Sequence, residues 1–233
     1  MRTINIIEIG EVKLKKSRLA KRLILKIDSS GNPVVTIPSI VPYAVAKKFA
    51  IQNASWIEKN MNKEQVETLM NGSKIGSEHV VLFKPTTTSK ISSRVQNSTI
   101  SISYPHNLDV SSSEVQAEAK KASVRALRAE ANEQLPSLLS SIAEHFGYKY
   151  KSVSIKKMNS RWGSCSSSGE IVLNIWLMQL PEDLINYVLC HELAHLNNHN
   201  HQAKFWSEVE AMVPDYKILR KQLKNYQPKL KLA

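Results

Sequence analysis

The stretch His191–His201, HELAHLNNHNH, contains four of the seven histidines in this 233-residue chain. It begins with the pattern H-E-x-x-H, in which His191 and His195 are four residues apart. On a helix this spacing sets two imidazoles ~5–6 Å apart at Cβ, so both can bind one zinc ion at ~2.0–2.1 Å. Glu192 points about a third of a turn away, where it can take a proton from a metal-bound water without being a ligand. The pattern predicts a metal site that activates water.

A third metal ligand is expected after this helix. Residues 196–200 are mostly Asn and His, which is typical of helix ends and turns, and Asn200 can cap a new helix that begins at His201. A residue just after such a turn can fold back over the first helix, which favours His201. His199, inside the turn, could also reach the ion, so both stay open. Cys190 points to a different side of the helix and is interpreted as a buried thiol.

The segment 181–196 has the features of a buried helix that would carry this pattern. It starts with Pro and two acidic residues, as helix N-termini do. Leu184, Val188, His191 and His195 fall on one stripe, next to a second stripe that is also largely apolar. Buried imidazoles and carboxylates need partners, because an unpaired polar group in the interior costs several kcal/mol. A bound metal ion would supply one.

The polar stretch NSRWGSCSSSGE, residues 159–170, has a functional and a structural interpretation. Arg161 could bind a substrate carboxylate or an oxyanion, and Trp162 could form the wall of a pocket. Alternatively, Trp162 anchors a tight turn in the core, which is the interpretation we favour. Cys165 could approach the metal as a removable fourth ligand or could be a packing residue. A carboxylate or a carbonyl should also orient each ligating imidazole, and Glu208 and Asp215 are the candidates, neither of which is favoured over the other.

The rest of the chain predicts an α+β fold with an N-terminal β-rich region. β-branched runs predict strands near the start and at 22–28, 33–38, 79–83, 98–104 and 170–178, with a hairpin turn at 29–32. Helical spacing predicts helices over 42–61 and 113–146, the latter kinked or divided at Pro136. We expect residues 1–112 to form the β-rich region, with one helix and a variable Ser/Thr-rich stretch. Residues 113–233 should form a mainly helical catalytic region, integrated with the first.

The chain is strongly basic, with a net charge of +12. Lys and Arg gather at 13–22, 120–128 and 217–224, where they could hold nucleic acid through its phosphates without reading bases. Solvated helix faces and a frayed basic tail explain these clusters nearly as well. Two cysteines are too few for the disulfide framework of a small secreted fold, and no apolar run suits a signal peptide or a membrane span of ~20 residues. We therefore expect a cytoplasmic protein with no membrane partner.

Three segments resemble the YgjP-like metallopeptidases. HELAHLNNHNHQAKFW is similar to that family's metal-binding helix followed by Asn-His and an aromatic pair, and NSRWGSCSSSGEIVLN to its Arg-Trp-Gly-Ser-Cys segment. SRLAKRLILKI and VVTIP resemble its opening strands. The family is similar to the WLM and SprT-like zinc proteases and to other compact zincins. The resemblance implies a compact zincin-like domain, with zinc ligands His191, His195 and His201 and catalytic base Glu192, and it does not fix a role for His199.

We therefore expect a zinc metallopeptidase that acts on a protein or peptide. Three histidine ligands leave an open position, where a water is acidified toward a pKa of ~7. Glu192 would accept its proton and pass it to the leaving amine. The strand at 170–178 could border the cleft and pair with an extended substrate, as in the zincin arrangement, or it could be an ordinary half-buried strand. Two alternatives stay open: a nucleic-acid-associated module in which zinc is mainly structural, and an enzyme that hydrolyses a non-peptide amide.

Overall fold

The computed structural model describes residues 2–6, 10–28, 32–61 and 68–228, so most of the predicted turn at 29–32 lies outside the described residues. The chain divides into two units, Met1–Glu67 and Thr68–Ala233. This division differs from the expected boundary after residue 112. Residues 68–112 belong with the second unit because their buried side chains, such as Ile100 and Ile102, share one apolar core with the long helix that follows them.

The first unit is a four-stranded sheet with two helices. The strands, β1 (Arg2–Ile6), β2 (Gly10–Ser17), β3 (Ile24–Ile27) and β4 (Pro33–Pro38), lie in the order β1-β2-β4-β3. β3 and β4 are antiparallel, which confirms the pairing of the predicted hairpin. The predicted helix over 42–61 is instead two helices, α1 (Tyr43–Gln52) and α2 (Ala54–Met61). Asn53 ends the first of them, because its side-chain amide donates to the Phe49 carbonyl at 2.8 Å.

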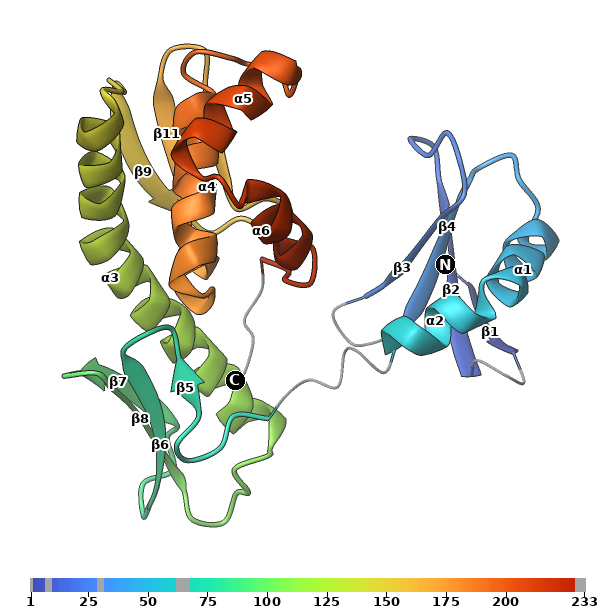
Figure 1. Cartoon of the computed structure of the whole chain (residues 1–233). Coiled ribbons are helices and arrows are strands. Elements are labelled where there is room, and N and C mark those ends of the chain that lie inside the picture. Colours follow the sequence, from blue (N-terminus) through green and yellow to red (C-terminus); the bar gives the residue numbers. More distant parts are fainter. Residues whose placement is uncertain (1, 7–9, 29–31, 62–67, 229–233) are drawn as a thin grey trace. The chain divides into compact units, whose positions relative to one another are not determined.

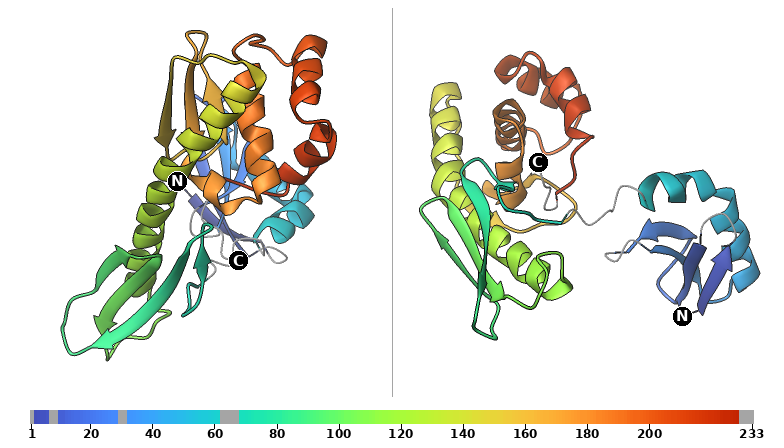
Figure 2. Two further views of the ribbon diagram at one scale, coloured as in Figure 1. Left: turned by 60° about the vertical axis from the view of Figure 1, so that its left-hand side comes forward. Right: turned by 90° about the horizontal axis from the view of Figure 1, so that it is seen from below.

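The second unit is arranged along one long helix, α3 (Ser113–Phe146), as Figure 1 and Figure 2 show. Next to one end of α3 lies a four-stranded sheet with the order β5-β6-β8-β7. Its strands are β5 (Lys74–Ile75), β6 (His79–Thr86), β7 (Ser92–Gln96) and β8 (Thr99–Pro105). Pro136 does not divide α3, contrary to one form of the prediction. Leu135 and Leu139, on either side of it, are both fully buried in the same core and hold the two halves to one surface.

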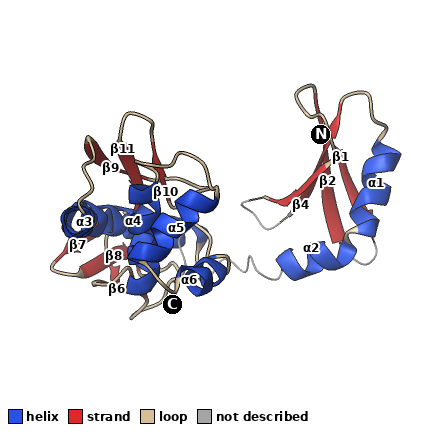
Figure 3. Cartoon of the chain, turned by 45° about the horizontal axis from the view of Figure 1, so that its top comes forward, coloured by secondary structure: helices blue, strands red, loops and turns tan. Residues whose placement is uncertain are grey.

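Next to the other end of α3 lie a three-stranded sheet and the remaining helices, as Figure 1 shows. Figure 3 draws the strands of this sheet in red and the helices in blue. The sheet has the order β10-β11-β9, with β9 (Ser152–Lys156), β10 (Gly163–Cys165) and β11 (Glu170–Asn174). The predicted strand over 170–178 ends at Asn174, whose side chain caps the short 3₁₀ helix η2 (Ile175–Gln179). The helices that follow are α4 (Glu182–Ala194), α5 (Ala203–Met212) and α6 (Tyr216–Leu223). The basic segment 217–224 is therefore largely helical rather than a frayed tail.

None of the helices within the described ranges combines the length and the apolar content that crossing a membrane requires.

A buried carboxylate in the middle of α3 fixes the turn between β5 and β6. Glu130 is only 1% exposed, and it accepts hydrogen bonds from the backbone N–H of Ser77 at 3.1 Å and of Glu78 at 3.3 Å. His79 Nδ1 lies 2.5 Å from the same carboxylate. Gly76 has a φ of +64°, and a Cβ added there would lie 2.7 Å from Glu130 Cδ. This position therefore needs glycine for its backbone angle and for space.

We expect Gly76→Ala to lower the free energy of unfolding by about 2–4 kcal/mol, because left-handed strain adds to overpacking against a buried carboxylate. Gly72→Ala is the matched control: its φ is +85°, but nothing lies within 4 Å of an added Cβ. The control should lose only about 1–2 kcal/mol, from backbone strain. Urea denaturation followed by tryptophan fluorescence measures both. Equal losses would show that the approach of Glu130 does not constrain this turn.

Candidate active site

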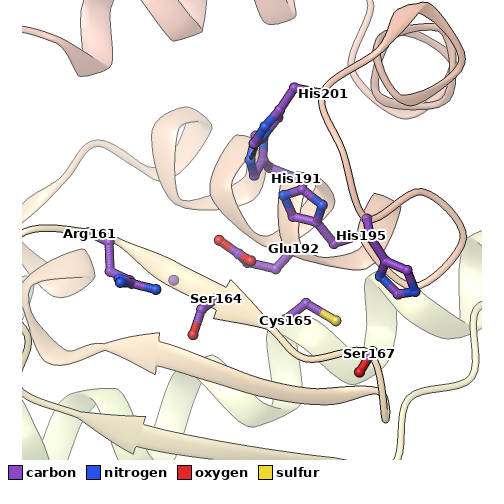
Figure 4. A pocket seen from close by; sticks show the side chains of 10 residues that line it. Arg161, Ser164, Cys165, Ser167, His191, Glu192, His195 and His201 are labelled. Atoms are coloured by element: carbon purple, nitrogen blue, oxygen red, sulfur yellow. Dashed lines mark hydrogen bonds between the residues drawn. The ribbon is translucent and has the colours of Figure 1, made fainter.

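The structure brings His191, His195 and His201 together (Figure 4). One ring nitrogen from each lies within 4.8 Å of the others. The Nε2 atoms of His191 and His201 are 3.1 Å apart. Two nitrogens bound to one zinc ion at ~2.0–2.1 Å in a tetrahedron would be ~3.3 Å apart, so these residues fit a bound metal ion. Among the residues that the structure describes, His199 lines the same pocket but is not part of this group.

The end of α4 sets the positions of the first two histidines. His195 follows the last residue of α4 with helical angles (φ −67°, ψ −17°), so it keeps its i, i+4 relation to His191. Its Nδ1 lies 3.0 Å from the carbonyl oxygen of Asn198, to which it can donate. That bond leaves Nε2 free to face the other two rings, an arrangement that is typical of metal-ligating histidines.

His201 precedes α5 and is not its first residue. The prediction that Asn200 caps a helix beginning at His201 is wrong, because α5 begins at Ala203 and Gln202 stands at its N-cap. His201 is held instead by Trp206, whose indole N–H donates to the His201 carbonyl at 3.0 Å. The two rings are also stacked, with centroids 5.6 Å apart.

Phe205 forms the apolar support beneath the histidines. It is fully buried, and its ring centroid lies 4.9 Å from that of His191, 4.5 Å from His195 and 4.7 Å from His201. A single aromatic ring therefore contacts all three imidazoles and limits their rotation.

The carboxylate of Glu208 braces the loop between α4 and α5. It accepts hydrogen bonds from the Tyr148 hydroxyl at 2.5 Å, from the side-chain amide of Asn197 at 2.5 Å, and from that of Asn198. Burial, reinforced by Glu208, raises the pKa of Tyr148, which stays a donor. Because the Asn198 carbonyl faces His195, Glu208 supports a candidate ligand indirectly. Asp215, the other candidate for this role, stands at the N-terminus of α6.

Glu192 is buried beside the histidines, with 5% of its surface exposed. One carboxylate oxygen has no hydrogen-bond partner among the described residues. Burial raises the pKa of Glu192 to about 8, and the positive charge of Arg161 opposes this rise. Burial, with His195 and His201 nearby, lowers the pKa of His191 to about 3. His191 is therefore a neutral imidazole at pH 7, which is the form that binds metals.

Gly163 allows the sheet to approach Glu192 closely. A Cβ at position 163 would lie 2.6 Å from Glu192 Oε1 and 2.8 Å from its Cγ, so no other residue fits without displacing the carboxylate. This role of Gly163 was not identified from the sequence. A glycine inside a strand is the signal that could have indicated this close approach.

The strand that borders the pocket is β10, and the prediction that the 170–178 strand does so is wrong. β11 is paired on both sides, with β10 and with β9, whereas β10 is an edge strand of this sheet. Gly163, Ser164 and Cys165 of β10 line a pocket of about 460 Å³ together with the histidines and Glu192. β10 has the sequence Gly-Ser-Cys, whereas β11 contains Ile, Val and Leu, so β11 is easier to recognise as a strand in the sequence.

The structure supports the functional interpretation for Arg161 and the structural interpretation for Trp162. Arg161 is exposed, lines the pocket and extends toward Glu192 (Figure 4), whereas Trp162 is partly buried against the core. Their loop is held by Asn174, which was not identified from the sequence. Its buried side-chain amide donates to the Arg161 carbonyl at 2.7 Å and to the Met158 carbonyl at 2.8 Å. A polar residue inside the apolar run IVLNIWLM is the signal that could have found it.

Neither cysteine belongs to the group of candidate ligands. Cys165 lines the pocket, but burial and the charge of Glu192 raise its pKa to about 11, so it is a thiol at neutral pH. Its Sγ donates to the Ser166 carbonyl at 3.4 Å. Cys190 is buried as predicted, and burial raises its pKa to about 11 as well.

Comparisons with known proteins give one matching family and several solved structures with partial similarity. The sequence model of the YgjP-like metallopeptidase domain matches residues 21–226. The crystal structure of the metallopeptidase zymogen of Pyrococcus abyssi abylysin is 28% identical, covers 40% of this chain and 93% of its own, and has a TM-score of 0.36. That of Methanocaldococcus jannaschii jannalysin is 20% identical, covers 40% and 95%, and also has a TM-score of 0.36. No curated protein matches the chain.

The positions of the histidines predict different effects for two neighbouring substitutions. We expect His201→Ala to weaken zinc binding by more than about 100-fold, beyond the 10–100-fold that is typical of supporting residues. His199→Ala should leave the affinity within a few-fold of the wild type. Competition titration of Zn²⁺ against a chromophoric chelator measures both. Loss of the metal in His199→Ala but not in His201→Ala would reverse the assignment.

The brace formed by Glu208 predicts an effect on the metal site at a distance. We expect Glu208→Ala to reduce zinc affinity about 10–100-fold, because the Asn198 carbonyl that faces His195 loses its support. Glu210→Ala is the matched control on the same helix, since Glu210 is exposed and pairs only with Lys217 at 3.3 Å in the contacts described. The same titration applies, with thermal melts of the metal-free proteins to check folding. An unchanged zinc affinity in Glu208→Ala would mean that the loop between α4 and α5 keeps its conformation without Glu208.

Proposed function

The chain belongs to the YgjP-like metallopeptidase family, and from that premise we propose that it hydrolyses peptide bonds with a zinc ion held by His191, His195 and His201 and with Glu192 as general base. The observation that carries this proposal is the convergence of three histidine nitrogens beside a buried, incompletely bonded carboxylate on one wall of a pocket.

The number of candidate ligands favours a catalytic over a structural metal. A structural zinc site normally takes four protein ligands, whereas a catalytic site takes three and keeps one position open. Among the described residues only three side chains gather, and all of them are histidines. Zinc is proposed because neutral imidazole suits it well, and because it binds readily in a three-histidine tetrahedral site.

The proposed mechanism assigns a separate task to each part of the pocket. A zinc ion there would acidify a water and polarise the scissile carbonyl. Glu192 takes the proton from the attacking water and delivers it to the leaving amine. Its burial keeps the carboxylate dry and raises its basicity, and the positive charge of Arg161 favours its ionised form. Arg161 extends toward the same region and can stabilise negative charge that develops there.

The substrate would bind as an extended strand. β10 is an edge strand, and its backbone groups lie along the pocket beside Glu192. A peptide that added to this edge would form main-chain hydrogen bonds without regard to its sequence, while pockets for its side chains would give specificity. This is why a peptide is favoured over a smaller non-peptide amide.

The alternative, a nucleic-acid-associated module, has less support. Several residues of the basic clusters contact their own chain: Lys13 pairs with Asp28 at 2.8 Å, Lys217 with Glu210 at 3.3 Å, and Arg220 lies 4.3 Å from the Trp206 ring centroid. Such contacts favour the interpretation of these clusters as structural and solvated faces. Binding to nucleic acid stays a prediction, and salt-dependent binding to DNA or RNA would be its measurement.

The role of Glu192 predicts a selective loss of catalysis. We expect Glu192→Gln to lower kcat/KM for peptide cleavage by about 10²–10⁴-fold, because the isosteric amide cannot accept a proton. Zinc affinity should stay at the wild-type value. Glu182→Gln, an exposed position in the first turn of the same helix, is the control and should be fully active. Cleavage of a quenched fluorescent peptide library, with zinc content measured in parallel, decides the matter. Equal activity in Glu192→Gln and wild type would exclude Glu192 as the base.

A further inference from the structure

A second, smaller recess of about 230 Å³ adjoins the proposed active site. It shares part of its lining with the pocket already described, at Arg161, Gly163, His191 and Glu192. Its remaining walls are formed by Trp162, Tyr187, Val188 and Leu223. Pockets for drug-sized ligands measure about 300–1,000 Å³, so this recess suits a single side chain rather than a whole small molecule.

The recess stands in a fixed relation to Glu192 and His191. On α4, Tyr187 lies four residues before His191, and Val188 lies four residues before Glu192. Residues with this spacing are neighbours, ~5–6 Å apart at Cβ. An extended peptide advances ~3.4 Å per residue. A substrate side chain in the recess therefore belongs to a residue next to the bond that Glu192 would help to cleave.

Trp162 provides a wall whose backbone is firmly held. Its carbonyl accepts a hydrogen bond from the backbone N–H of Asn174 at 2.9 Å. The buried side chain of Asn174 also bonds to the carbonyl of Arg161, the residue before it. Aromatic and aliphatic walls on a fixed backbone stabilise a bound apolar side chain by removing it from water.

Leu223 closes the recess from a different part of the sequence. It is the last residue of α6 and is partly buried against the core. α6 is held in turn by Trp206, since the Tyr216 ring is stacked on it with centroids 5.4 Å apart and Arg220 lies over it. Leu223 thus has a defined position and can limit the size of the side chain that enters.

From these walls we propose that the recess is a specificity subsite for one large apolar side chain, such as Leu, Met or Phe, adjacent to the scissile bond. The inference rests on the proposed function and adds a substrate class to it. Arg161 at the rim disfavours Lys and Arg in the same place, because like charges repel. A small side chain such as Ala leaves the apolar walls unfilled and gains little from burial.

Amino-acid hydroxamates test the recess without any need for cleavage, because the hydroxamate binds the metal and carries its side chain into the neighbouring space. We expect the zinc-loaded protein to bind N-acetyl-leucine hydroxamate about 10–200-fold more tightly than the alanine analogue, and the lysine analogue no better than alanine. Isothermal titration measures all three. Equal affinities for leucine and alanine would overturn the subsite while leaving the metal site intact. Binding of none of them would remove both proposals.

Substitutions on α6 test whether the preference for the leucine hydroxamate over the alanine hydroxamate arises from the recess. Leu223→Trp should fill it and bring the leucine-to-alanine ratio close to 1. Ile218→Trp is the matched control, since Ile218 is on the same helix but 59% exposed and outside the recess, and its ratio should match the wild type. If Leu223→Trp fails to fold, Leu223→Ala should instead accept a naphthylalanine hydroxamate that the wild type rejects. An unchanged ratio in Leu223→Trp, or an unchanged size limit in Leu223→Ala, would contradict the proposal.

Discussion

The close approach of the Glu192 side chain to the backbone of Gly163 is the constraint on which the rest of the site depends. It joins a buried helix to an edge strand at a separation that excludes any side chain at position 163. Because the carboxylate is buried and one oxygen lacks a partner in the described structure, this arrangement costs stability. The surrounding core supplies the compensation: Phe205 beneath the histidines, Asn174 behind the loop, and the apolar faces of α4. The fold retains a reactive group that it does not fully satisfy, as is common at functional sites.

The long helix α3 explains why the Ser/Thr-rich region belongs with the enzyme. One buried face of α3 packs on the β5–β8 sheet, and the same face continues to η2, β9 and α4. Glu130 adds directional hydrogen bonds to this apolar contact and fixes where the β5–β6 turn meets the helix. The same helix therefore contacts both the β5–β8 sheet and the elements that position the histidines.

Much of the site could be predicted from the sequence, because the H-E-x-x-H spacing and the helix signals around it are local. His201 could be favoured over His199, although the start of α5 was misplaced by two residues. The edge position of β10, the space at Gly163 and the amide network of Asn174 depend on contacts between segments distant in sequence, which periodicity does not report. The division of the chain after residue 67, rather than after residue 112, could not be predicted for the same reason. The alternation of apolar and polar residues in a strand does not show which hydrophobic core the strand joins. Zinc and location in the cytoplasm stay predictions.

The clamp between Trp206 and α6 has a consequence for the order in which the protein matures. Synthesis runs from the N-terminus, so the helix bearing His191 and His195 leaves the ribosome before the residues that steady His201. Trp206 holds the His201 carbonyl, and its ring is itself held by Tyr216 and Arg220 of α6. The contacts that support His201 are therefore complete only once α6 has been synthesised and has packed against Trp206.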